Sequence, residues 1–245
     1  MIPGFPMGLS KSVLLPAAQG QQIFENTGTF IVPDRVYSIC MVCVAQGSGH
    51  GGALAYTNNV AVTPGQSVYV RDVSGNFEIE VGGIVVCRAQ GHLAEDCIGD
   101  VANSGGLSSP LNQGGGGAAG YSGNGGDGAT GWGSDGSPGS GGGGGGGAGD
   151  GTVNNLRGHG GGVGLKGEGF SGAGGDGGSS STQPALQGSG GSGGSGGNFM
   201  SGGGTYGGGA GRSYYDGKYI ASPGPGGARI IWGPGRSYPN NAQDV

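Results

Sequence analysis

Four cysteines and three histidines are the residues of this chain best suited to metal binding or covalent chemistry. They are Cys40, Cys43, Cys87 and Cys97, with His50, His92 and His159. The C-x2-C spacing of the first two cysteines is half of a structural zinc signature, and the last two cysteines could form a disulfide. The first pair, however, lies in a segment with strand character, where residues i and i+3 point to opposite faces. We therefore favour a third interpretation, in which the thiols are free and buried and the protein assembles in a reducing cytoplasm.

The usual arrangements of catalytic residues are not apparent in the sequence. The histidines have no neighbouring serine or cysteine nucleophile in a recognisable setting. Glu78 and Glu80 are the nearest paired carboxylates, and they alternate on one face of an expected strand. The glycine runs also lack the G-x-x-x-x-G-K-[ST] pattern of a phosphate-binding loop. We therefore expect a protein that is not an enzyme and that uses no cofactor and no metal.

Glycine dominates the composition, with 70 of the 245 residues and 48 of the 98 residues from Gly114 to Gly211. Such a stretch has too few side chains to build a hydrophobic core or a catalytic cleft, so its structure must come from the backbone. The ten basic residues are scattered and the net charge is −5. Because nucleic-acid binding requires clustered Lys and Arg, nucleic acid is not an expected partner.

The first 20 residues are expected to form an irregular docking arm. They carry a short apolar patch at residues 13–15 but lack a basic region, and they are interrupted by Pro3, Pro6 and Pro16. These features argue against a cleaved secretory signal. No apolar run in the chain approaches the 18 or so residues of a membrane-spanning helix.

Residues 21–104 have the pattern of a small β-rich attachment domain. The segment 36–44 is apolar on both faces, so the strand it forms should be buried on both faces. Gly82 and Gly83 should join a hairpin, and no helical periodicity is present. We predict an all-β, sandwich-like domain and essentially no α-helix. Its expected strands cover residues 28–33, 36–44, 67–73, 77–81 and 84–88, and another ends at the Pro64-Gly65 turn.

Residues 105–227 differ from both collagen and an ordinary flexible linker. Collagen needs glycine at every third position and abundant proline, whereas these glycines occur in consecutive runs. A Gly/Ser linker is the default interpretation of such a composition, yet bulky and charged residues punctuate the runs regularly. We instead predict a bundle of polyglycine II helices, which are extended and have about three residues per turn.

A polyglycine II bundle depends on hydrogen bonds between neighbouring segments. One segment has no internal hydrogen bonds, so several must pack side by side and exchange N–H···O=C bonds. Glycine is needed because a Cβ would hold the backbones apart. Bulky residues should collect at the turns between segments. Residues 228–245 should form a closing strand that returns to the first domain, followed by a C-terminal tail.

Three stretches of the chain resemble glycine-rich phage tail proteins. Residues 27–39 are similar to their "GTFTVPxGVxxI" opening, residues 54–66 to their "YxNNIxVTPGQ" turn, and residues 227–239 to their "VRIIWGxGRxYP" ending. With the glycine runs, these stretches cover most of residues 27–239. The chain thus resembles the receptor-binding adhesins at the fibre tips of T-even-like bacteriophages, although residues 45–52 and 85–100 are less glycine-rich than is usual in that family.

The resemblance implies a virion protein at the tail-fibre tip, made in the host cytoplasm, in which a β-rich attachment region adjoins a polyglycine II sandwich. Its partners would be a tail-fibre or baseplate protein and a bacterial surface receptor, such as an outer-membrane protein, a pilus or a glycan. It would act as a homotrimer or as a single copy on a trimeric fibre. Loops between the glycine helices would bind the receptor. The candidate contact residues are Tyr121, Trp132, Leu156, Arg157, Lys166, Phe170, Leu186, Phe199 and Met200.

Each candidate residue also has a structural interpretation. The apolar side chains could fold back over the edges of the bundle, and the charged ones could be solvated surface, as could Asp135, His159 and Glu168. The tyrosines at 214, 215 and 219 could bind sugar, although we favour a role in capping the bundle. For the whole chain, the alternative function is a purely structural connector of the tail fibre that does not touch the host.

Overall fold

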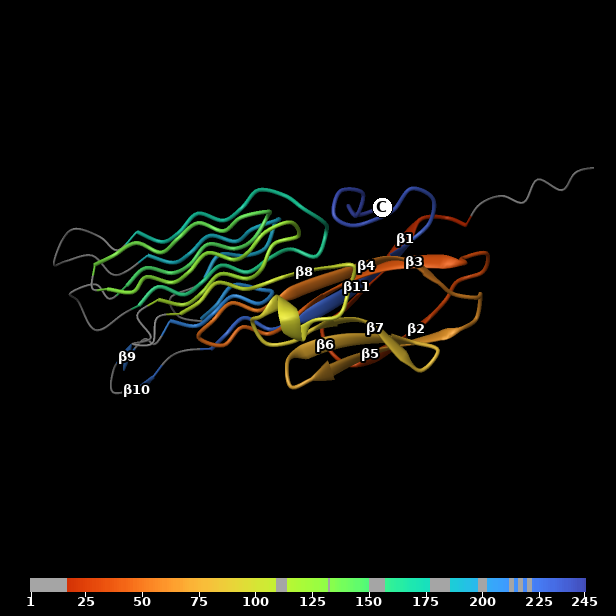
Figure 1. The fold of residues 1–245 in the computed structure, drawn as a ribbon, viewed down its shortest axis with the longest axis horizontal. Coiled ribbons are helices and arrows are strands. Elements are labelled where there is room, and N and C mark those ends of the chain that lie inside the picture. Colours follow the sequence, from red (N-terminus) through yellow and green to blue (C-terminus); the bar gives the residue numbers. More distant parts are fainter. Residues whose placement is uncertain are drawn as a thin grey trace, which may run out of the picture.

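The computed structural model describes residues 17–108, 114–131, 133–149, 157–176, 186–197, 202–211, 214–215, 218–219 and 222–245. These residues form a β-sandwich and a bundle of glycine-rich segments that lie end to end (Figure 1). Within them, the one helical element is the three-residue 3-10 helix η1 (Ala94–Asp96), so none of the described helices is long and apolar enough to cross a membrane. The prediction of an all-β fold essentially without α-helix is confirmed for this part of the chain.

The sandwich consists of two antiparallel sheets. The first has the strand order β1-β11-β3-β4-β8, and the second has the order β2-β5-β6-β7. A separate two-stranded ribbon pairs β9 (Tyr214–Tyr215) with β10 (Lys218–Tyr219). The other strands are β1 (Gly20–Phe24), β2 (Gly28–Ile31), β3 (Ser38–Val44), β4 (Leu54–Ala61), β5 (Ser67–Val73), β6 (Asn76–Val81), β7 (Ile84–Ala89), β8 (Val101–Asn103) and β11 (Gly227–Trp232).

Most of these strands follow from the local sequence pattern. The five expected ranges are present as β2, β3, β5, β6 and β7, with small shifts at their ends, and the β6–β7 hairpin turns at Gly82 and Gly83, both with positive φ. Two strands of the sandwich are not predicted by the sequence pattern. β1 carries two glutamines in five residues and β8 has only three residues, so neither shows a clear alternation of apolar and polar side chains.

The last strand, β11, is an inner strand of the first sheet. β11 lies between β1 and β3, with Ile230 opposite Gln22 on one side and Met41 on the other. The expected return of the C-terminal strand to the sandwich is therefore confirmed. The glycine-rich region between β8 and β11 is consequently anchored to the sandwich at both of its ends.

The first sheet is buried on both faces. Between the two sheets, Ile39, Met41 and Ile230 pack with Phe30 and Phe77. On the opposite face of the first sheet, a second core includes Val42, Val44, Leu54, Tyr56 and Ile231, with Tyr121, Val163, Leu165, Tyr238 and Ala242 from the bundle and the C-terminal segment. The burial of alternate β3 residues in opposite cores confirms the prediction made for residues 36–44.

The glycine segments exchange hydrogen bonds with a period of three residues. In segment 142–149, successive N–H groups donate to three different neighbouring segments, and the sequence of neighbours then repeats. The N···O distances are 2.8–3.0 Å. The bonds run from Gly144 and Gly147 to Ala118 and Gly115, from Gly145 and Ala148 to Ser189 and Leu186, and from Gly146 and Gly149 to Ser137 and Ser134.

Positions inside the bundle leave no room for a side chain. A Cβ on Gly117 would lie 2.0 Å from the carbonyl oxygen of Gly144, and a Cβ on Gly144 would lie 2.1 Å from that of Gly161. Real Cβ atoms do not approach backbone oxygens so closely, so these positions require glycine. The connection 46–52, between β3 and β4, also takes part, since Gly51 donates to Gly106 at 2.9 Å.

Candidate functional site

The two ends of the glycine bundle have different surroundings. The near end, formed by the turns at 121–124, 140–143, 165–170 and 192–194, lies toward the sandwich (Figure 1), and Tyr121 and Leu165 pack against the first sheet and the C-terminal segment. There the N–H of Glu168 donates to the carbonyl oxygen of Pro239 at 2.8 Å. The far end, which includes residues 148–149, 157–158, 175–176 and 186–187, points away from the sandwich (Figure 1).

The far end brings together the ends of several segments. The backbone N–H of Leu186 donates to the carbonyl oxygen of Asp176 at 3.0 Å, and that of Gly158 donates to the carbonyl oxygen of Ala148 at 2.9 Å. These residues come from four different segments, so the four segments lie side by side at this end of the bundle. The β9–β10 ribbon also lies toward this end (Figure 1).

The predicted contact residues divide between the two ends. Leu186 lies at the far end with 52% of its surface exposed, and Gly158, the residue after Arg157, lies against the carbonyl oxygen of Leu186. Lys166 and Phe170 lie at the near end instead. Phe170 is 96% exposed, whereas the ammonium of Lys166 is paired with the carboxylate of Asp244. The other apolar candidates lie outside the described residues: Trp132, Leu156, Phe199 and Met200.

Tyr121 is not on a receptor-facing surface. Its side chain is fully buried, and its hydroxyl donates to the carbonyl oxygen of Gly164 at 3.0 Å. Burial raises the pKa of this phenol well above its ordinary value. A side chain without exposed surface cannot contact a receptor, so Tyr121 leaves the candidate set. Its role is to join the bundle to the first sheet, which the sequence pattern alone could not distinguish from a role in a loop.

His159 also departs from its expected place. The sequence favours a solvated surface position, but the His159 side chain is fully buried among glycine segments. Of the other polar residues considered with it, Asp135 is exposed. Glu168 accepts a hydrogen bond from the hydroxyl of Ser122 at 2.8 Å.

Arg229 holds the near end of the bundle to the sandwich. Its side chain on β11 is fully buried, and Nη1 donates to the carbonyl oxygens of Leu165 at 2.8 Å and Ala242 at 2.5 Å. Nη2 donates to Gln21 and to Asp244. One guanidinium thus connects β1, a bundle turn and the C-terminal segment. The sequence signal is an arginine within the otherwise apolar run of β11, where a buried charge requires partners.

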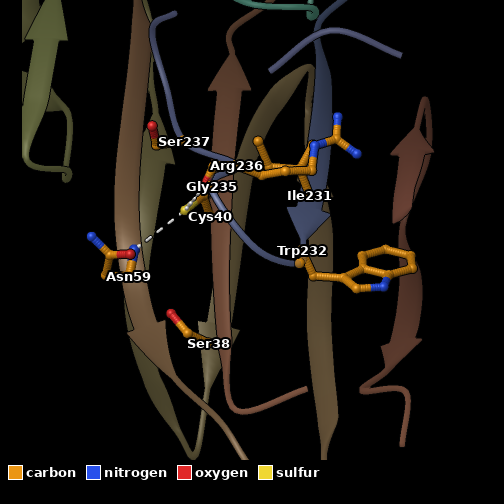
Figure 2. Close-up of a pocket in the computed structure, with 9 residues that line it drawn as sticks. Ser38, Cys40, Asn59, Ile231, Trp232, Gly235, Arg236 and Ser237 are labelled. Carbon is orange, nitrogen blue, oxygen red and sulfur yellow. Dashed lines mark hydrogen bonds between the residues drawn. The ribbon is translucent and has the colours of Figure 1, made fainter. Parts of the chain in front are cut away.

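The cysteines carry no catalytic arrangement. All four are free thiols and three are buried, so the expected free thiols are present and Cys87 is not bridged to Cys97. Cys40 lines a cavity of about 290 Å³ beside Ser38, Asn59 and Ser237; its Sγ accepts a hydrogen bond from the backbone N–H of Asn59 at 3.4 Å (Figure 2).

The cavity beside Cys40 lacks the features of an active site. The indole of Trp232 points away from the thiol (Figure 2). Burial raises the pKa of the Cys40 thiol, which therefore stays protonated. Within the described residues, no cluster of three His, Cys, Asp or Glu side chains could hold a metal ion.

No protein-family model matches this chain, and no curated protein matches it.

Proposed function

We propose that this protein is a non-enzymatic adhesin of a bacteriophage tail-fibre tip, and that its glycine bundle is a polyglycine II lattice with receptor-binding loops at the far end. The three-residue period of the hydrogen bonds is the observation that supports the lattice. In a helix with three residues per turn, residues i and i+3 face the same neighbour, and the two residues between them face two others. A β-strand would give a period of two.

A lattice of this kind provides a rigid spacer without a hydrophobic core. Ordering each glycine costs about 0.5–1 kcal/mol more than ordering alanine, and each lateral hydrogen bond contributes about 0.5–1.5 kcal/mol. Because the two terms are of similar size, the segments are stable only as a group. The anchoring of the bundle by β8 and β11 favours such cooperative order.

The far end is the part of the bundle best placed to meet a receptor. It points away from the sandwich, and it carries exposed Leu186 and, on a neighbouring segment, Arg157. We assign receptor contact to these two residues together with the sequence-based candidates Trp132, Leu156, Phe199 and Met200. The sandwich, with the N-terminal arm, would bind the tail-fibre or baseplate protein. Weak contacts at each tip would be strengthened by several fibres acting on one cell.

Binding of the purified protein to bacterial cells tests this function. Susceptible cells are compared with resistant mutants that lack the surface receptor, using the unchanged protein and the variants Leu186→Ser and Trp132→Ser. The matched control is Tyr69→Ser, because Tyr69 is 47% exposed but lies on β5 of the sandwich. We expect binding to susceptible cells only, a loss of at least tenfold in the Leu186→Ser and Trp132→Ser variants, and no loss in the control.

The same experiment separates the adhesin from a structural connector. A folded protein that binds susceptible and resistant cells equally, or neither, contradicts receptor recognition. Circular dichroism of each variant must match that of the unchanged protein, so that lost binding is not lost folding.

A further inference from the structure

His159 is an ionisable side chain buried within the glycine bundle. None of its surface is exposed. Its Nδ1 accepts a hydrogen bond from the backbone N–H of Gly211 at 3.0 Å. Nδ1 is therefore unprotonated, and the proton of the neutral ring is on Nε2, which has no hydrogen-bond partner among the described residues.

Among the described residues, the groups around His159 do not stabilise a positive charge on its ring. Its backbone N–H donates to the Gln187 side chain at 2.6 Å, its carbonyl oxygen accepts from Gly188 at 2.8 Å, and Gly197 packs against it. Within the described residues, the segments in contact with His159 carry no carboxylate there. They are residues 147–148, 186–188, 197 and 209–211.

The nearest charged side chains along these segments do not stabilise a protonated His159 ring either. Arg157 lies two positions before His159 and would oppose a second positive charge. Asp176 is exposed at the far end. Burial is the cause that lowers the pKa of His159, to about 4, and no charged group contributes.

We infer that His159 makes the far half of the glycine bundle acid-labile, so that its protonation opens the bundle there while the β-sandwich stays folded. An imidazolium is a donor at both nitrogens and an acceptor at neither. Protonation therefore places a proton on Nδ1, which accepts the Gly211 N–H in the neutral ring. Two donors, Nδ1–H and the Gly211 N–H, then face each other. It also leaves a charge among backbone groups in a site closed to water.

The direction of the effect follows from proton linkage. An unfolded histidine has a pKa near 6.5, above the folded value of about 4, so the open state binds more protons. Stability of this region is complete above about pH 6.5 and is lost as the pH falls toward 4. At pH 4.5 the opening equilibrium should be about 60-fold larger than at pH 7. The inference does not depend on the proposed receptor, although an adhesin built this way would lose binding reversibly in acid.

The other two histidines supply the matched control. His50 and His92 stack with ring centroids 4.3 Å apart where the bundle meets the sandwich. Burial and the neighbouring His92 lower the pKa of His50, and Asp127 opposes that shift. Protonation of His50 should loosen that junction rather than the far end. The variant His50→Asn/His92→Asn therefore leaves His159 as the remaining histidine.

Hydrogen exchange of the full chain at pH 7.0 and pH 4.5, corrected for the intrinsic pH dependence of exchange, tests the inference. In the unchanged protein and in the double variant, we expect protection of residues 157–163 and 207–211 to fall by tens of fold in acid while β5 to β7 stay protected. In His159→Asn the fall should be at most about threefold, because asparagine can accept the Gly211 N–H but does not titrate.

An equal fall in His159→Asn would overturn the inference, and so would an equal loss of protection in β5 to β7. If that variant does not fold, NMR titration of the unchanged protein decides. An imidazole pKa of His159 near 4 supports the inference, and a value near 6.5 refutes it.

Discussion

Tyr121 and Tyr238 stack with their ring centroids 5.7 Å apart and their planes only 7° from parallel. Tyr121 belongs to the first near-end turn of the bundle, and Tyr238 belongs to the C-terminal segment. Tyr56 of β4 lies 6.1 Å from the first ring and 6.0 Å from the second. Three parts of the chain that are far apart in sequence thus meet in one aromatic cluster, which fixes the bundle to the first sheet.

Removing a ring from this cluster should cost much of the protein's stability. Tyr121→Ala leaves a buried cavity, and we expect a loss of about 3–5 kcal/mol in the free energy of unfolding measured with urea. Tyr121→Phe removes only the hydrogen bond to Gly164 and should cost about 0.5–1.5 kcal/mol. Tyr37→Ala serves as the control because Tyr37 is 65% exposed. Equal unfolding midpoints for Tyr121→Ala and Tyr37→Ala would contradict the packing role.

A single methyl group should disrupt the interior of the bundle. The added Cβ in Gly144→Ala would meet the carbonyl oxygen of Gly161, and we expect a loss of about 3 kcal/mol or more of stability. In Gly131→Ala the nearest atom to the new Cβ is the Ser134 hydroxyl at 3.4 Å, so this control should retain the native unfolding curve. Similar curves for the two variants would show that the segments are not closely packed.

The buried guanidinium of Arg229 should matter more than an exposed one. Arg229→Met leaves the carbonyl oxygens of Leu165 and Ala242 without their donor, and we expect a loss of about 3 kcal/mol in thermal or urea unfolding. Arg71 forms ion pairs with Glu78 and Glu80 on the outer face of the second sheet. Because that side chain is exposed, Arg71→Met should leave the unfolding temperature unchanged. A larger loss of stability in Arg71→Met than in Arg229→Met would contradict the role of Arg229 in holding the bundle to the sandwich.

The thiols should be slow to react until the sandwich unfolds. Burial raises the pKa of Cys40, Cys43 and Cys97, so little thiolate is present at neutral pH. We expect maleimide labelling in native buffer to be slow and to reach Cys97 first, since it is the one thiol that is partly exposed. Labelling in denaturant should reach four thiols per chain, and rapid native labelling of Cys43 would contradict the buried core.

Sequence reasoning succeeded where the pattern of side chains is local. The alternation in residues 67–73 and the apolar run of residues 36–44 identify β5 and β3, because burial on one face or on both faces imposes those patterns. β1 cannot be identified in this way, because it has little alternation of its own. It forms a strand through its pairing with β11, about 200 residues away.

The candidate site was harder to predict because its environment is not local. Tyr121 and Phe170 both occupy turns between glycine runs, yet one is fully buried and the other is 96% exposed. The difference arises from Tyr238 and Tyr56, which come from distant parts of the chain. The burial of His159 likewise depends in part on Gln187 and Gly211, which lie 28 and 52 residues away.

Amide hydrogen exchange across Gly144 to Gly149 in the purified full chain is the most direct test of the central claim, that backbone hydrogen bonds with a three-residue period hold the glycine bundle in a fixed shape. All six consecutive amides donate to a neighbouring segment. We expect each of them to be protected as strongly as the amides of β3. Exchange at the rate of an unfolded chain, or protection only at every second residue, would contradict it.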